Sequence, residues 1–104
     1  MLFRSELSKV YQERREIIVT TLTELDFIVQ ESNATMFVWA KLPEKFSDSY
    51  EFSKKLLDEA NVAVSPGIGF GSAGEGYIRL ALVENKHRIR QAMKNLIKFF
   101  DSNV

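Results

Sequence analysis

The sequence of 104 residues contains no cysteine and a single histidine. Without cysteine the chain forms no disulfide, no thiolate zinc site and no thiol nucleophile, and one histidine cannot build a multi-histidine metal site. No apolar run approaches the ~20 residues that span a bilayer. The 14 basic residues balance the 14 acidic ones, whereas proteins that coat nucleic acid or anionic membranes usually carry a basic excess. We therefore expect no nucleic-acid partner and no membrane partner.

The amino-terminal residues lack the pattern of a secretory signal. Charge is present already at Arg4 and Glu6, and no small-residue cleavage site follows. We therefore expect a cytoplasmic protein.

The length and the apolar periodicity predict one domain, residues 1–104, with the element order α-β-β-α-β-β-α. Helices are expected at 5–25, from a cap at Asp48 or Ser49 to about residue 60, and after a cap at Asn85. Strands are expected at 27–29, 35–40, 62–64 and 77–83, with a turn at 31–33. This succession predicts an α+β fold in which helices cover one face of a small, mostly antiparallel sheet.

Alternation along the strands predicts which side chains face the helices. In the last strand these are Ile78, Leu80 and Leu82, and the last helix is expected to bury Ile89, Met93, Leu96, Ile97 and Phe100. The opposite side of the last strand carries Tyr77, Arg79, Ala81 and Val83; in the strand 35–40, Met36 and Val38 share one side and Phe37 and Trp39 the other. Bulky apolar residues on both sides are unusual for a free-standing two-layer domain, whose outer face is polar. We expect another part of a larger protein, or an interface, to cover this face.

Arg79 is the one charged residue in the apolar strand 77–83, and it follows a glycine-rich segment. A guanidinium presents a planar set of donors that matches a carboxylate, so Arg79 is a candidate for binding a carboxylate through two hydrogen bonds. The alternative is a solvated or ion-paired strand arginine. Spacing alone leaves both interpretations open.

All five glycines of the protein lie between residues 67 and 76. A dinucleotide-binding glycine motif opens a helix that receives the pyrophosphate, but this segment leads into a strand. We therefore expect a strand connection or a loop on the substrate side, and no phosphate site. His87 is expected on the surface, and neither Ser65 nor Ser72 has the base that a serine nucleophile needs.

Several segments resemble, in order, the carboxy-terminal small domain of the class I and II (fold-type I) pyridoxal-phosphate aminotransferases. They are Tyr11-Gln-Glu-Arg-Arg-Glu16, Ala34-Thr-Met-Phe-Val-Trp-Ala-Lys-Leu-Pro-Glu44, Phe52-Ser-Lys-Lys-Leu-Leu-Asp-Glu-Ala60, Val62-Ala-Val-Ser-Pro-Gly-Ile-Gly-Phe-Gly71 and Gly74-Glu-Gly-Tyr-Ile-Arg-Leu-Ala-Leu-Val-Glu-Asn85. The resemblance extends over essentially the whole chain. It is strongest to the branch of alanine, aspartate and LL-diaminopimelate aminotransferases.

The resemblance implies an enzyme that transfers an amino group between an amino acid and a 2-oxo acid with pyridoxal 5'-phosphate. It implies that Arg79 binds the α-carboxylate of the substrate. It also implies that the loop residues Ser65, Pro66, Gly67, Gly69 and Gly71 line the entrance of the active site.

The same resemblance implies that the catalytic lysine, the aspartate facing the pyridine nitrogen and the phosphate-binding residues belong to a large domain absent from this sequence. Lys41, Lys54 and Lys94 lack a matching motif. We therefore expect no catalytic, cofactor-binding or metal-binding residue in this chain, and no activity of the chain alone. The missing large domain and a homodimer are the expected partners.

A second hypothesis from the residues is a free-standing binding module. Such a module would self-associate through the apolar sheet face, burying Phe37, Trp39 and Tyr77.

Overall fold

The computed structural model describes residues 4–30 and 36–102, and the turn predicted at 31–33 lies outside these ranges. The α-helices within them are α1 (Arg4–Glu24), α2 (Ser49–Ala60) and α3 (Lys86–Ser102). The strands are β1 (Ile28–Val29), β2 (Phe37–Lys41), β3 (Ser65–Pro66) and β4 (Tyr77–Ala81). Two short 3-10 helices, η1 (Gly67–Phe70) and η2 (Ser72–Gly74), lie between β3 and β4. The predicted order of helices and strands is confirmed.

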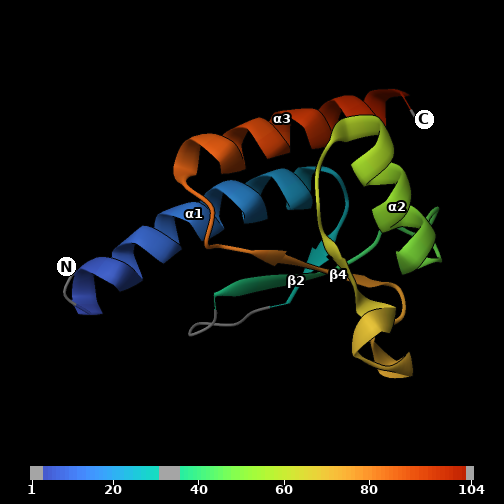
Figure 1. The fold of residues 1–104 in the computed structure, drawn as a ribbon, viewed down its shortest axis with the longest axis horizontal. Helices are drawn as coiled ribbons and strands as arrows, with labels where there is room; N and C mark the ends of the chain where they lie inside the picture. The colour runs from blue at the N-terminus through green and yellow to red at the C-terminus, as the bar shows by residue number, and fades with distance from the viewer. Residues whose placement is uncertain (1–3, 31–35, 103–104) are drawn as a thin grey trace.

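The strands form one sheet in the order β1-β2-β4-β3, and each pairing is antiparallel. The helices lie on one side of this sheet, where α1 and α3 run alongside each other and α2 lies near one end (Figure 1). The predicted α+β fold with helices on one face is therefore confirmed. Within the described ranges no helix is both long enough and apolar enough to cross a membrane.

The core lies between the sheet and the helices, as the alternation predicts. Ile78, Leu80 and Leu82 are buried, with exposed fractions of 0–6%. One end of the core is a cluster of phenyl rings with centroids 4.8–6.5 Å apart, formed by Phe27, Phe46, Phe52, Phe99 and Phe100. The edge-to-face contacts of Phe52 in α2 with Phe99 and Phe100 in α3 stabilise the packing of the two helices beyond the contribution of apolar burial.

Helix α1 is tied to the end of β4 by polar contacts. Arg14 Nη1 donates a hydrogen bond of 2.7 Å to the carbonyl oxygen of Leu82, directly after β4. Lys86, the first residue of α3, pairs with Glu13 at 3.3 Å and so joins α1 to α3 as well. β4 ends at Ala81 rather than at the predicted residue 83, because the Leu82 carbonyl turns toward α1. The Leu82 amide still donates to Met36 at 2.8 Å.

The prediction of a strand at residues 62–64 is wrong. That segment is irregular, and the strand β3 forms one step later at Ser65 and Pro66, which pair with Arg79 and Ile78 of β4. β3 accommodates a proline because it is at the edge of the sheet, where the missing amide hydrogen of proline needs no partner. This shift brings Ser65 opposite Arg79.

The predicted inner stripe of α3 is wrong at one position. Ile97 is 38% exposed, whereas Phe99 is buried and belongs to the phenyl cluster. Because a helix turns once every 3.6 residues, the buried stripe that contains Leu96 and Phe100 can extend to Ile97 or to Phe99. The rings of Phe46 and Phe52 pack against Phe99, so Phe99 is the residue that is buried.

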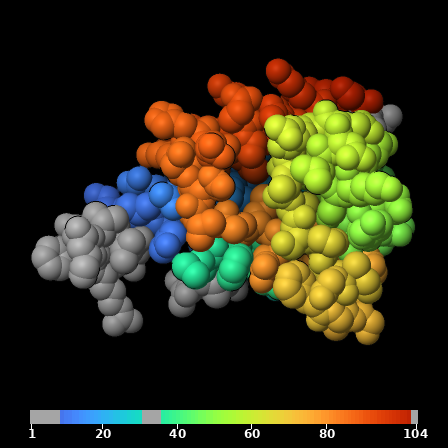
Figure 2. Space-filling model, viewed as in Figure 1, coloured from blue at the N-terminus to red at the C-terminus, as the bar shows by residue number. Residues whose placement is uncertain are grey.

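The segment between β3 and β4, which we call the glycine turn (residues 67–76), packs backbone against backbone. A Cβ on Gly67 would overlap the carbonyl oxygen of Gly74, and a Cβ on Gly74 would overlap that of Gly67. The two 3-10 helices can therefore lie against each other only because both residues lack a side chain. In Figure 2 the glycine turn forms a projection below α2.

We expect Gly67→Ala to lower the free energy of unfolding by about 1–3 kcal/mol, because the added methyl group has no space. Urea unfolding of the chain, followed by circular dichroism, measures the change. Gly69→Ala is the control, since a Cβ at Gly69 meets no atom within 4 Å. Equal losses in the two variants would contradict the close packing at Gly67.

Candidate functional site

Arg79 lies on the sheet face that the helices leave open, with its guanidinium between two aromatic rings. Its Cζ atom is 4.0 Å from the ring centroid of Phe37 and 4.4 Å from that of Phe70. Phe37 comes from β2 and Phe70 from the end of η1. Among the described residues no carboxylate forms an ion pair with Arg79. The guanidinium is thus stacked on two hydrophobic faces and retains its planar set of donors.

The ring of Phe70 also contacts Trp39, with centroids 5.3 Å apart. Trp39 is the β2 residue opposite Arg79 in the sheet register. A shallow hollow of about 400 Å³ opens beside these rings, lined by Gln30, Trp39, Phe70, Ala73, Gly74 and Tyr77. The open face therefore combines the Arg79 guanidinium with an aromatic surface and a hollow.

The glycine turn is attached to the amino terminus of α2 through Glu75 and Ser49. Glu75 Oε1 accepts hydrogen bonds from the amides of Ser49 at 2.7 Å and Gly76 at 2.8 Å. Ser49 Oγ, which is fully buried, accepts one from the Ile68 amide at 3.3 Å. The hydrogen bond from Ser49, with that from Gly76, lowers the pKa of the Glu75 carboxyl below its ordinary value of 4.5.

The five predicted entrance-loop residues are not equivalent in the structure. Ser65 and Pro66 form β3, with Ser65 opposite Arg79. Gly67 is buried against Gly74, whereas Gly69 and Gly71 are exposed. The fold therefore brings Ser65 and Arg79 together and leaves Gly69 and Gly71 on the outer side of the turn.

Sequence reasoning missed three participants in this arrangement. The alternation placed Phe37 on the correct face but did not show that it stacks on Arg79. Nothing in the sequence next to Phe70 or Glu75 indicates which residues they contact. Phe70 is the aromatic residue within the glycine run, and Glu75 directly precedes Gly76. The aromatic residue within a run of glycines is the one feature that could have drawn attention to the turn.

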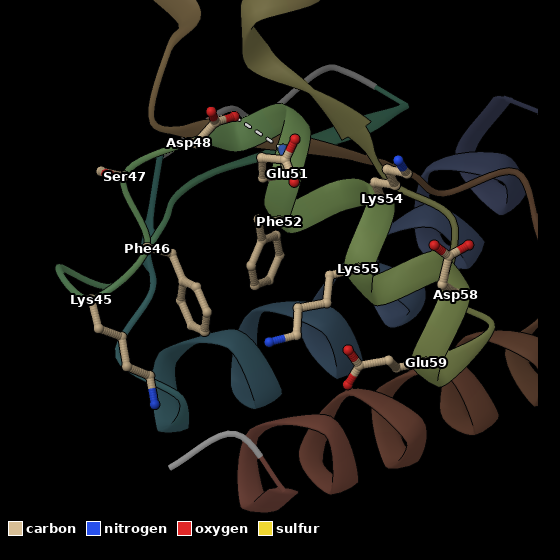
Figure 3. Close-up of a pocket in the computed structure, with 10 residues that line it drawn as sticks. All are labelled: Lys45, Phe46, Ser47, Asp48, Glu51, Phe52, Lys54, Lys55, Asp58 and Glu59. Carbon is tan, nitrogen blue, oxygen red and sulfur yellow. Dashed lines mark hydrogen bonds between the residues drawn. The ribbon is translucent and has the colours of Figure 1, made fainter.

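A second hollow, of about 390 Å³, lies between the segment 45–48 and α2 (Figure 3). Phe46 and Phe52 form its apolar part. The charged residues around it are of both signs: Lys45, Lys54, Lys55, Asp48, Glu51, Asp58 and Glu59. Asp48 accepts a hydrogen bond of 3.0 Å from the Glu51 amide and caps α2, which confirms the predicted cap. Mixed charge at an open surface does not select a ligand, so we assign none to this hollow.

No group of three or more potential metal ligands occurs in the part of the chain that the structure describes. His87 is exposed in the first turn of α3, as predicted. Asn85 caps that helix through a 3.0 Å hydrogen bond from the Arg88 amide. The site around Arg79 is therefore the strongest candidate in the described residues.

The model of the family "Aminotransferase class I and II" matches residues 3–96. The chain belongs to this family. It is 46% identical over 97 residues to glutamate-pyruvate aminotransferase AlaC of Escherichia coli (strain K12), covering 91% of this chain and 24% of that protein. It is 43% identical over 95 residues to an LL-diaminopimelate aminotransferase of Natranaerobius thermophilus, covering 91% of this chain and 24% of that protein.

Solved aminotransferase structures contain the same fold. The chain superposes on the aromatic aminotransferase from Pyrococcus horikoshii OT3 with a TM-score of 0.90 and 28% identity, covering 95% of this chain and 26% of that one. The predicted resemblance to an aminotransferase small domain is therefore confirmed. The chain spans about a quarter of the length of the curated relatives it matches.

The lowered pKa of Glu75 predicts a pH-dependent contribution to the stability of this aminotransferase domain. A carboxyl whose pKa is lower in the folded state stabilises the fold above its ordinary pKa, and this contribution disappears as pH falls through the lowered value. We expect wild type to be more stable than Glu75→Gln near neutral pH, with a difference that shrinks below pH 4.5. Urea unfolding at several pH values tests this.

The control for removing one surface charge is Glu16→Gln, at an exposed position of α1. If the difference in unfolding free energy between wild type and Glu75→Gln does not shrink below pH 4.5, the ionised carboxylate does not have this role.

Proposed function

We propose that the whole protein is a pyridoxal-phosphate-dependent aminotransferase that transfers an amino group between an amino acid and a 2-oxo acid. In this proposal Arg79 binds the α-carboxylate of the substrate. The observation that carries it is the position of the Arg79 guanidinium on the open sheet face, held between Phe37 and Phe70. Family membership supplies the reaction class.

The geometry around Arg79 suits a carboxylate for a physical reason. Stacking on two rings restricts the guanidinium to a plane and leaves the donors at its edge available for two parallel hydrogen bonds. A hollow opens next to Trp39 and Phe70, and Phe70 is one of the two rings that stack on Arg79. We further propose that Ser65, Pro66, Gly67, Gly69 and Gly71 line the entrance to this site.

The residues around Arg79 do not fit the cofactor by themselves. Pyridoxal phosphate supplies the electron sink of transamination and needs an amine that forms an imine with it. The groups that stack on Arg79 are phenyl rings, which offer no amine, and no carboxylate of the described residues pairs there. We propose that a large domain provides these groups, that residues 1–104 form a small domain and that this domain alone is inactive. The cytoplasm and a homodimer are also part of the proposal.

The open sheet face supports the proposal of a missing large domain. Phe37, Trp39 and Tyr77 are only half-buried there, and an aromatic face of this kind is unfavourable in water. Relatives about four times longer than this chain have the length to provide a cover.

Substitution of Arg79 tests its role in the complete enzyme. We expect Arg79→Ala to lower kcat/KM for the amino acid, because each charge-assisted hydrogen bond contributes about 1.5–3 kcal/mol. Arg79→Lys keeps the charge but loses the planar pair of donors, so its loss should be intermediate. The control is Arg90→Ala, at an exposed position of α3. An unchanged kcat/KM in Arg79→Ala would rule out the proposed contact.

The second candidate, a self-associating module, is favoured by the same half-buried rings. Sedimentation of the 104-residue chain separates the two. We expect no defined dimer, but concentration-dependent aggregation that Trp39→Glu reduces. A stable dimer that Trp39→Glu dissociates would favour the module, since specific dimers usually bury more than ~1,000 Å².

A further inference from the structure

Glu75 lies in the glycine turn and connects this turn to the amino end of α2. Its carboxylate binds the amide of Ser49, the first residue of α2, and the amide of Gly76, directly before β4. Ser49 in turn accepts the Ile68 amide. Two hydrogen bonds thus link the turn to α2, one at the end of the turn and one near its beginning.

The position of Phe70 depends on this attachment. Phe70 is 51% exposed, so burial contributes little to holding its ring. The backbone on both sides of Phe70 is held, since the Gly71 amide donates to the Ile68 carbonyl at 3.1 Å and the Gly74 amide donates to the Gly71 carbonyl at 3.0 Å. Backbone hydrogen bonds therefore connect Phe70 to the rest of the turn, which Glu75 and Ser49 attach to α2.

We propose that Glu75 is a positioning residue for substrate binding: it holds the glycine turn on α2 and so keeps the Phe70 ring against the guanidinium of Arg79. The inference rests on the proposed function of Arg79 as the carboxylate-binding residue. Glu75 itself touches neither Arg79 nor the substrate in this scheme. Its effect is transmitted to Phe70 through the backbone of the glycine turn.

The physical consequence of losing Glu75 follows from the stacking. Without Phe70 in place, Arg79 contacts the ring of Phe37 on one side only, and its long side chain regains rotational freedom. Ordering the guanidinium again on binding a carboxylate then costs free energy. Substrate affinity should fall, while the chemical step, which this proposal assigns to groups outside the chain, is affected less.

The test uses the complete enzyme with the variants Glu75→Ala, Phe70→Ala and the corresponding double variant. We expect Glu75→Ala to raise KM for the amino acid roughly 3- to 30-fold, the range of a lost cation–π contact, with a smaller change in kcat. Glu75→Gln keeps an acceptor oxygen for the Ser49 amide, so it should restore most of the loss. Asp58→Ala removes an exposed carboxylate from α2, the helix to which the turn is attached, and should match wild type.

The double variant decides whether Glu75 acts through Phe70. If it does, Glu75→Ala should have almost no effect on KM once Phe70 is alanine, because the two residues belong to one pathway. Additive effects of the two substitutions would overturn the proposal. So would a Glu75→Ala enzyme whose thermal stability falls while its KM equals that of wild type.

Arg79→Ala, measured in parallel, separates this proposal from the one on which it rests. If KM and kcat/KM do not change in Arg79→Ala, the proposed function of Arg79 fails. If Arg79→Ala has its expected effect and Glu75→Ala does not raise KM, only the positioning role of Glu75 fails. Should Glu75→Ala not fold, Glu75→Asp, whose shorter side chain should not reach the Ser49 amide, provides the same comparison in the Phe70 wild-type and Phe70→Ala backgrounds.

Discussion

The structure depends on the central place of β4 in the sheet. β4 pairs with β2 on one side and with β3 on the other, so its backbone direction is determined by two sets of hydrogen bonds. Because side chains alternate along a strand, burial of Ile78 and Leu80 beneath the helices forces Arg79 onto the opposite face. The cation thus reaches the open face as a consequence of core packing, without any contact that selects for it.

Helix α2 joins the core to the candidate site. Its side chains Phe52 and Leu56 are buried among the core residues, while its first residue, Ser49, holds the glycine turn. The stability of the core is therefore transmitted to a surface loop through a helix end. This loop adds little buried side-chain surface of its own, since its close packing is between the backbones of Gly67 and Gly74.

The open face fits the proposal that this fold is one domain of a larger protein. Half-buried aromatic residues on a sheet face cost solvation free energy unless another surface covers them. In our proposal a large domain covers this face, and the curated relatives, of whose length the chain spans about a quarter, are long enough to include one. The same face carries Arg79, so a covering domain would also enclose the cation and exclude water from it, which strengthens its electrostatic interactions.

The sequence alone determined the order of elements, the inner and outer faces of β4, the caps of α2 and α3 and the family, because periodicity, caps and motifs are local along the chain. The tertiary structure decided what local patterns do not encode. It moved the edge strand to Ser65 and Pro66, buried Phe99 in place of Ile97, and brought Glu75 to Ser49 across 26 residues of sequence. It also stacked Phe37 and Phe70 on Arg79. Such contacts depend on which segments the packed core brings together, and propensities of neighbouring residues carry no record of that.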